Sequence, residues 1–261
     1  MLRSLYTAAT GMNAQELKMD VISNNLANAS TVGFKKQRAE FEDMLSETLR
    51  AAQGPDPRGG GSTSSLQVGL GVKPMATTRS QQQGDLFNTN NQTDLAIEGS
   101  GFFRVLRPNG EEAYTRAGNL RIDSTGVLVT QHGESIEPRI TVPAETTQIT
   151  ITSDGVVTAQ VAGKTDPQEL GQIELSTFVN PAGLDTIGNN MMVPTAASGQ
   201  ATRVKPGEQG TGTLAQGYLE SANVKAVEEM IDMISTQRAY ELNSKVIQTA
   251  DQMLQRLTSL R

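Results

Sequence analysis

The chain has 261 residues, a formal net charge of -6, no cysteine, and hydrophobic residues make up 36% of it. The length allows one or two domains, and the acidic balance argues against nucleic acid as the main partner because no basic excess is available to neutralise phosphates. The absence of cysteine excludes disulfides and thiolate chemistry, and the aromatic content of 4% predicts a modest, aliphatic core.

The first predicted element is a helix over residues 1–30. Its apolar residues recur at the alternating three- and four-residue spacing of a heptad, with Glu16 and Ser23 as polar exceptions. We expect this seam to pack against other helices. The seam residues are Leu2, Leu5, Ala9, Met12, Met19 and Leu26.

This segment does not have the pattern of a secretory signal. Glu16, Lys18 and Asp20 interrupt it before an apolar core of sufficient length, and no stretch of the chain is apolar enough to span a membrane. The sequence therefore leaves two interpretations: a cytoplasmic protein, or one exported by a route that cleaves no signal peptide. In neither case is the chain inserted in a membrane.

A polar motif ends the first helix. Asparagine, serine and threonine side chains compete with helical hydrogen bonds, and a glycine permits a backbone conformation that other residues avoid. On residue types alone, an ordinary helix cap and turn is favoured over a functional motif. The residues of this connector motif are Asn25, Asn28, Thr31, Gly33, Phe34 and Lys35.

Residues 31–93 form an extended connector, to which the chain returns over residues 205–222. Residues 38–52 have a short amphipathic pattern, and residues 54–65, rich in glycine and proline, predict an extended or mobile loop. Residues 66–72 alternate apolar with other residues, as a strand does.

The middle of the chain, residues 94–204, predicts an antiparallel β-rich domain. Turn signals such as Asn109-Gly110 and Asp154-Gly155 separate short runs of β-forming residues. Short strands between glycine turns are typical of all-β domains. The expected strands include residues 127–129, 149–151, 156–158, 171–178 and 191–194.

The last predicted element is a long helix over residues 223–261, with Asn223 as its N-cap and with Glu228 and Glu229 near its positive end. At 1.5 Å per residue it is roughly 55 Å long, too long for one small domain to cover. Its seam residues are Met233, Tyr240, Ile247 and Leu254, in line with Ala226, and a flanking apolar set comprises Val227, Ile231, Ile234, Val246, Met253 and Leu260.

The expected fold class is therefore α+β and discontinuous. The terminal helices, residues 1–30 and 223–261, pair like a coiled coil, and the antiparallel β-rich domain is inserted between them. Because two paired helices still leave apolar surface uncovered, we infer that copies of the chain pack together.

The residue types do not point to an enzyme. His132 is the single histidine, in an expected turn, and a catalytic base needs an orienting carboxylate and a nucleophile. One histidine and no cysteine give poor support for zinc, and the glycine pairs at 69–71 and 99–101 lack the rest of a dinucleotide fingerprint. We expect no catalytic residue, cofactor or metal. The competing hypothesis is a cell-wall-binding β module with coiled-coil ends, against which the few aromatic residues and scattered aspartates count.

Several motifs resemble one protein family. The segment 24–28 (NNLAN) with Thr31, Gly33, Phe34 and Lys35 resembles the N-terminal signature of the bacterial flagellar rod and hook axial proteins. Residues 221–245 resemble that family's C-terminal signature, and residues 95–103 and 113–118 its β domain. Residues 41–45, 66–69 and 249–254 resemble most the distal rod branch. The resemblance covers nearly the whole chain and is weakest at residues 51–65.

The resemblance implies a structural subunit of the flagellar axis. Such a subunit is exported through the flagellar type III apparatus without a cleaved signal. It polymerises helically in the periplasm, joins the proximal rod proteins to the hook protein, and turns inside the ring proteins of the wall and outer membrane. A proximal rod or hook protein is the alternative within the family.

Overall fold

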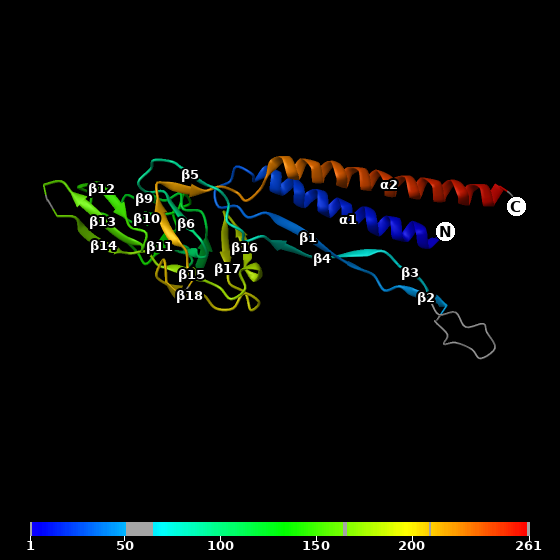
Figure 1. Cartoon of the computed structure of the whole chain (residues 1–261), viewed down its shortest axis with the longest axis horizontal. Helices are drawn as coiled ribbons and strands as arrows, with labels where there is room; N and C mark the ends of the chain where they lie inside the picture. The colour runs from blue at the N-terminus through cyan, green and yellow to red at the C-terminus, as the bar shows by residue number, and fades with distance from the viewer. Residues whose placement is uncertain (1, 51–64, 164–165, 209, 260–261) are drawn as a thin grey trace. The chain divides into compact units, whose positions relative to one another are not determined.

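The computed structural model describes residues 2–50, 65–163, 166–208 and 210–259 (Figure 1). The chain divides into two compact units, each assembled from segments distant in sequence. One contains residues 1–26, 37–78 and 225–261, and the other contains residues 27–36 and 79–224. We call them the helical unit and the β unit. The α+β class, with helices at both ends and an antiparallel β-rich middle, is confirmed.

In the helical unit, α1 (Leu2–Ala27) and α2 (Ala226–Ser259) lie side by side and run in opposite directions (Figure 1). The Asn25 Nδ2 donates to Glu229 Oε2 over 3.2 Å. A β-carbon added to Gly11 would lie 2.9 Å from Nδ2 of Asn243, so the helices are in close contact there too. Each contact lies fourteen residues from the other on both helices, so the register is constant over about 21 Å.

The predicted start of the second helix at Asn223 is wrong by three residues. Helix α2 begins at Ala226, and the Asn223 side chain bonds to other chain segments instead of capping the helix. Glu228 and Glu229 do lie in its first turn and Arg256 in its last, as the helix dipole favours. With 34 residues, α2 is about 51 Å long.

A β ribbon completes the helical unit. It consists of β1 (Gln37–Asp43), paired with β4 (Val72–Arg79), and β2 (Glu47–Arg50), paired with β3 (Leu66–Val68). Within residues 38–50 the amphipathic pattern thus belongs to β1 and β2, and the single strand predicted over residues 66–72 is interrupted by residues 69–71, which end at Gly71. There φ is +114°, and an added β-carbon would lie 2.2 Å from Oγ1 of Thr10 on α1. Most of the predicted loop of residues 54–65 lies outside the described residues.

The β unit contains sixteen described strands, and every pairing in it is antiparallel. The largest sheet has nine strands; a sheet of β12, β13 and β14 and the pairs β6–β19 and β5–β20 complete the unit. The first eight strands are β5 (Leu86–Asn88), β6 (Leu95–Glu98), β7 (Phe102–Leu106), β8 (Glu112–Thr115), β9 (Arg121–Ile122), β10 (Leu128–Val129), β11 (Ser135–Glu137) and β12 (Thr146–Ile151). The rest are β13 (Val156–Val161), β14 (Gln168–Gln172), β15 (Leu175–Thr177), β16 (Asp185–Gly188), β17 (Met191–Val193), β18 (Thr202–Val204), β19 (Thr213–Gln216) and β20 (Tyr218–Glu220), with a 3₁₀ turn at Pro181–Gly183.

The main hydrophobic core lies in the β unit. Seventeen buried residues form it, among them Leu95, Phe103 and Leu175, and each of these three is fully buried. The predicted strand at residues 171–178 is divided, because β14 pairs with β13 whereas β15 pairs with β7 and β18. The chain crosses between two sheets there, and fully buried Ile173 lies at the crossing.

Candidate functional site

The predicted seam residues are mostly half-covered in the single chain. Leu5, Ala9, Met12, Met19 and Leu26 on α1, and Met233, Ile247 and Leu254 on α2, are half-buried, while Tyr240 is 40% exposed; Leu2 lies in the first turn of α1. The buried hydrophobic residues among the described residues of the two helices are instead mostly small: Ala8, Ala14, Val21, Ile22 and Ala250. In the described part of the helix pair there is therefore no large apolar core.

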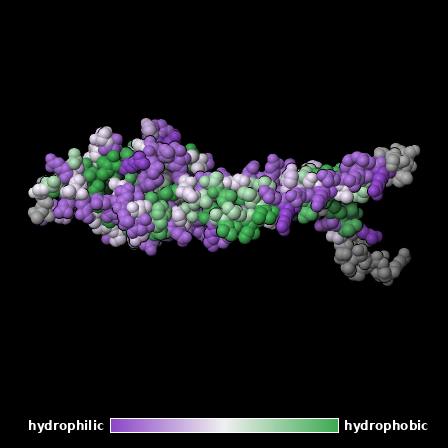
Figure 2. Space-filling model, turned by 90° about the horizontal axis from the view of Figure 1, so that it is seen from above, coloured by the Kyte–Doolittle hydropathy of each residue, from purple (hydrophilic) through white to green (hydrophobic). Residues whose placement is uncertain are grey.

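Helix α2 has a second apolar face that nothing in the described helical unit covers. Val227, Ile231, Ile234, Leu242, Val246 and Met253 are between 46% and 70% exposed and recur at the spacings of one helical face. With Tyr6 on α1, and with Met230 and Tyr240, nine large hydrophobic residues are exposed among the described residues of the two helices. Figure 2 shows hydrophobic residues, in green, at the surface among hydrophilic ones.

The connector motif contributes to a buried ionic cluster in the β unit. Glu220 Oε1 accepts from Lys35 Nζ at 2.6 Å and from Gly84 N at 2.9 Å, and Oε2 accepts from Arg116 Nη1 at 3.1 Å. The side chains of Lys35, Glu220 and Arg116 are 3%, 1% and 4% exposed. Burial lowers the pKa of the Lys35 ammonium, and the bond to Glu220 opposes this shift. We call these three residues the charge cluster.

Asn223 joins three passes of the chain in the β unit. Its Oδ1 accepts from the Lys36 N–H at 2.6 Å, and its Nδ2 donates to the carbonyls of Ser80 and Gln82, each at 3.0 Å. Lys35 Nζ also donates to the Gln82 carbonyl, at 2.7 Å. These bonds hold the segments at Lys36, at residues 80–82 and at Asn223 against one another.

Gly33 has the left-handed backbone that its residue type suggested, with φ +70°. An added β-carbon would lie 2.8 Å from the Ala117 nitrogen and 2.9 Å from the Arg116 carbonyl carbon, and its own N–H donates to the Glu220 carbonyl at 2.8 Å. Two backbones thus approach closely at Gly33, and a side chain has no room.

The other motif residues shape the turn after α1. Thr31 donates from its N–H to the Asn28 carbonyl and from its hydroxyl to Asn28 Oδ1. Half-buried Phe34 donates its N–H to the Thr31 carbonyl, and its own carbonyl accepts from Asn223. The motif is thus both a helix end and a junction, so the two interpretations left open by its residue types are compatible.

Asn25 belongs to the helical unit and bonds to both helix α2 and strand β1. Its side-chain amide pairs with the Gln37 backbone in both directions, at 2.9 Å each, and also donates to Glu229. Asn25 and Glu229 are each 1% exposed. The Asn25 amide therefore satisfies both backbone polar groups of Gln37, the first residue of β1.

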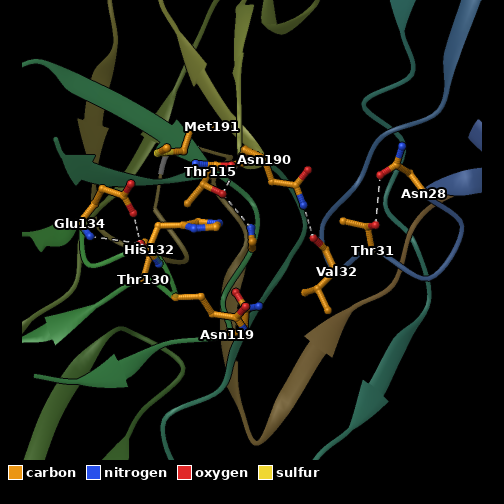
Figure 3. A pocket seen from close by; sticks show the side chains of 13 residues that line it. Asn28, Thr31, Val32, Thr115, Asn119, Thr130, His132, Glu134, Asn190 and Met191 are labelled. Atoms are coloured by element: carbon orange, nitrogen blue, oxygen red, sulfur yellow. Dashed lines mark hydrogen bonds between the residues drawn. The ribbon is translucent and has the colours of Figure 1, made fainter. Parts of the chain in front are cut away.

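His132 lies in a turn, as expected, and lines a pocket of about 460 Å³ in the β unit (Figure 3). Thr130, Glu134 and Asn190 also line it, and the Thr130 hydroxyl donates to Glu134. No group of three or more metal-ligating side chains occurs among the described residues. Within the described chain, neither helix is apolar over a stretch long enough to cross a membrane.

The charge cluster is the part of the site that the sequence did not reveal. Arg116 lies in the motif at residues 113–118, and Glu220 directly precedes the C-terminal motif, but nothing in one sequence pairs them with Lys35. A partial signal in the sequence is that Arg116 and Glu220 each lie at the end of a strand with buried hydrophobic residues.

Comparison with known proteins agrees with this architecture. A family model described as "Flagella basal body rod protein" matches residues 5–35, the "Flagellar hook protein FlgE/F/G D1 domain" matches residues 96–159, and the "Flagellar basal body rod FlgEFG protein C-terminal" matches residues 215–260. The matched segments include most of α1 with the connector motif, part of the β unit, and α2.

Relatives that match over the full length identify the branch of the family to which the chain is most similar. The chain is 49% identical over 261 residues to the flagellar basal-body rod protein FlgG of Caulobacter vibrioides, covering 100% of both chains. It is 50% identical over 256 residues to that of Borreliella burgdorferi, covering 97% of both. The flagellar hook protein FlgE of Helicobacter mustelae is 44% identical over 138 residues, which are 52% of this chain and 30% of the hook protein. The chain therefore belongs to the FlgG family of flagellar basal-body rod proteins and is a structural subunit of the distal rod.

Proposed function

We propose that α1 and α2 are the assembly elements of a helical polymer of this chain. One observation carries the proposal: among the described residues of the two helices, nine large hydrophobic residues are exposed, whereas the buried hydrophobic residues are mostly alanines. Exposed apolar faces of this extent favour association. A repeated contact between different surfaces that does not close on itself produces a filament.

In this polymer the assembly elements are residues 1–30 and 223–261, which line the inside of a tube. Residues 31–93 and 205–222 are the connector, and residues 94–204 face outward. The ten seam residues, from Leu2 to Leu254, together with the exposed face of α2, would be buried between neighbouring subunits. Close-packed side chains are poorly compressible, so such a tube transmits torque.

The polymer would be the drive shaft that crosses the periplasm and joins the proximal rod proteins to the hook protein. Its outward β units would turn within the ring proteins of the wall and outer membrane. The names of the rod and hook relatives support axial partners. Export through the flagellar type III apparatus, without a cleaved signal peptide, is supported by the charged residues Glu16, Lys18 and Asp20 within the first helix.

The test is assembly of the purified full-length chain. Electron microscopy of a concentrated sample should show straight filaments, whereas a dilute sample should be monomeric by sedimentation. Because isolated helices are marginally stable, helix content by circular dichroism should rise on polymerisation. A chain that stays monomeric at every concentration and condition would overturn the proposal.

A further inference from the structure

The polar pocket at His132 contains a buried carboxylate with no cationic partner among the described residues. Glu134 is 7% exposed, and the one side-chain contact found for its carboxylate is with the Thr130 hydroxyl. No Lys or Arg of the described chain forms an ion pair with it. A carboxylate that lines a polar pocket attracts a basic group, and the pairing strengthens when the occupant excludes water.

The wall around Glu134 offers hydrogen-bonding groups and no positive charge. Asn119, Thr115 and Asn190 line the pocket together with His132, and the described lining includes no Lys or Arg. In Figure 3 the Glu134 side chain extends towards Thr130 and His132. Amide oxygens and a carboxylate accept hydrogen bonds from N–H groups, and charge-assisted bonds of this kind are the strongest.

The pocket wall is held in place. The Asn190 Nδ2 donates to the Val32 carbonyl at 2.6 Å, and the Asn190 carbonyl accepts from the Thr115 hydroxyl at 2.9 Å. Asn189 and Asn190 both have positive φ, 54° and 57°, in the turn between β16 and β17. Positive φ at both central residues is typical of a two-residue hairpin turn, and asparagine is among the residues that favour it.

We propose that this pocket receives the guanidinium group of an arginine from a neighbouring copy of the chain, which pairs with Glu134. The inference rests on the proposed assembly. The volume of about 460 Å³ admits a side chain with its backbone, and the pocket has too few charged ligands for a metal ion. In a helical homopolymer every pocket faces the same surface of the neighbouring subunit. The same arginine of each subunit can therefore pair with Glu134 of the next.

His132 makes the proposal directly measurable. As the single histidine of the chain, it gives one imidazole Cε1–Hε1 signal in NMR spectra. Dilute, monomeric full-length chain is titrated with N-acetyl-arginine amide and, separately, with N-acetyl-citrulline amide, which has the same shape without the charge. We expect a saturable shift with the arginine probe and none with the citrulline probe. Glu134→Gln should weaken arginine binding roughly tenfold or more, because the bond loses its charge.

A second measurement follows assembly. Glu134→Gln should raise the critical concentration for polymerisation about tenfold, whereas Glu145→Gln, which changes an exposed carboxylate in the same unit, should not alter it. An unchanged urea midpoint shows that each variant is folded.

The outcomes separate the two proposals. No shift with the arginine probe, an equal shift with citrulline or potassium chloride, or normal polymerisation of Glu134→Gln would overturn the pocket assignment and leave the assembly proposal intact. Arginine-specific binding by a wild-type chain that never polymerises would instead overturn the assembly proposal.

Discussion

The Lys35 ammonium lies 2.6 Å from Oε1 of Glu220, although 185 residues separate the two in the chain. Arg116 adds a second cation to the same carboxylate. Glu220 therefore connects Lys35, at the end of the connector motif, with Arg116, which directly follows β8. Two buried cations share one buried anion, and the cluster depends on that anion.

Replacement of Glu220 should therefore be severe. Glu220→Gln leaves Lys35 and Arg116 buried without their carboxylate, and breaking a buried pair costs about 3–5 kcal/mol. The free energy of unfolding, measured by urea denaturation, should fall by that amount. Glu111→Gln is the matched control, because its bridge to Arg107 is 65% exposed on the glutamate side and should change stability by less than about 1 kcal/mol. Similar losses for both variants would contradict the role of the charge cluster.

Gly33 should tolerate no side chain. Gly33→Ala combines a left-handed backbone, which costs about 1–2 kcal/mol, with a β-carbon within 3 Å of two backbone atoms. Gly110→Ala has the same backbone cost, with φ +82°, and no atom within 4 Å of the new carbon. Urea denaturation should show a clearly larger loss for Gly33→Ala, and filament formation should fail only in that variant. Equal losses would remove the close approach as the reason.

The exposed face of α2 should be needed for assembly but should not contribute to the stability of the monomer. Ile231→Asp places a charge on a residue that is 61% exposed in the single chain but buried in the proposed polymer. We expect no filaments by electron microscopy and an unchanged urea midpoint.

Gln237→Asp is the matched control, because it adds the same charge at an exposed position about 120° around the helix from Ile231. It should polymerise better than Ile231→Asp. Normal filaments from Ile231→Asp would show that this face is not buried in the rod.

Tyr114 should make the β unit sensitive to alkali. Burial, followed by its hydrogen bond to Glu112, raises the pKa of the phenol from 10.0 to about 12. Between these pH values the unfolded chain releases the proton and the folded chain keeps it, so the free energy of unfolding falls as the pH rises. Tyr114→Phe should lose less stability than wild type between pH 10 and 12 in urea denaturation. Absorbance at 295 nm should show one late tyrosinate transition, absent in this variant.

Local patterns were sufficient to predict the secondary structure of the ends and the class of the middle. The seam spacing predicted both helices, and turn signals such as Asn109-Gly110 predicted the antiparallel strands, because these features depend on neighbours in sequence. The strand at residues 171–178 was mispredicted because its two halves pair with different sheets, a property of register that no short window contains.

By itself the sequence determined that the chain has two long helices with excess apolar surface around an antiparallel β insert, and that Gly33 needs a special backbone. Only the tertiary structure decided which helical face remains exposed, that Asn223 joins three chain passes rather than capping α2, and that Lys35, Arg116 and Glu220 form one buried cluster. The physical reason is distance along the chain: spacing fixes what a residue does within its own turn or strand. A buried charge or amide is defined by partners that folding brings from a hundred or more residues away.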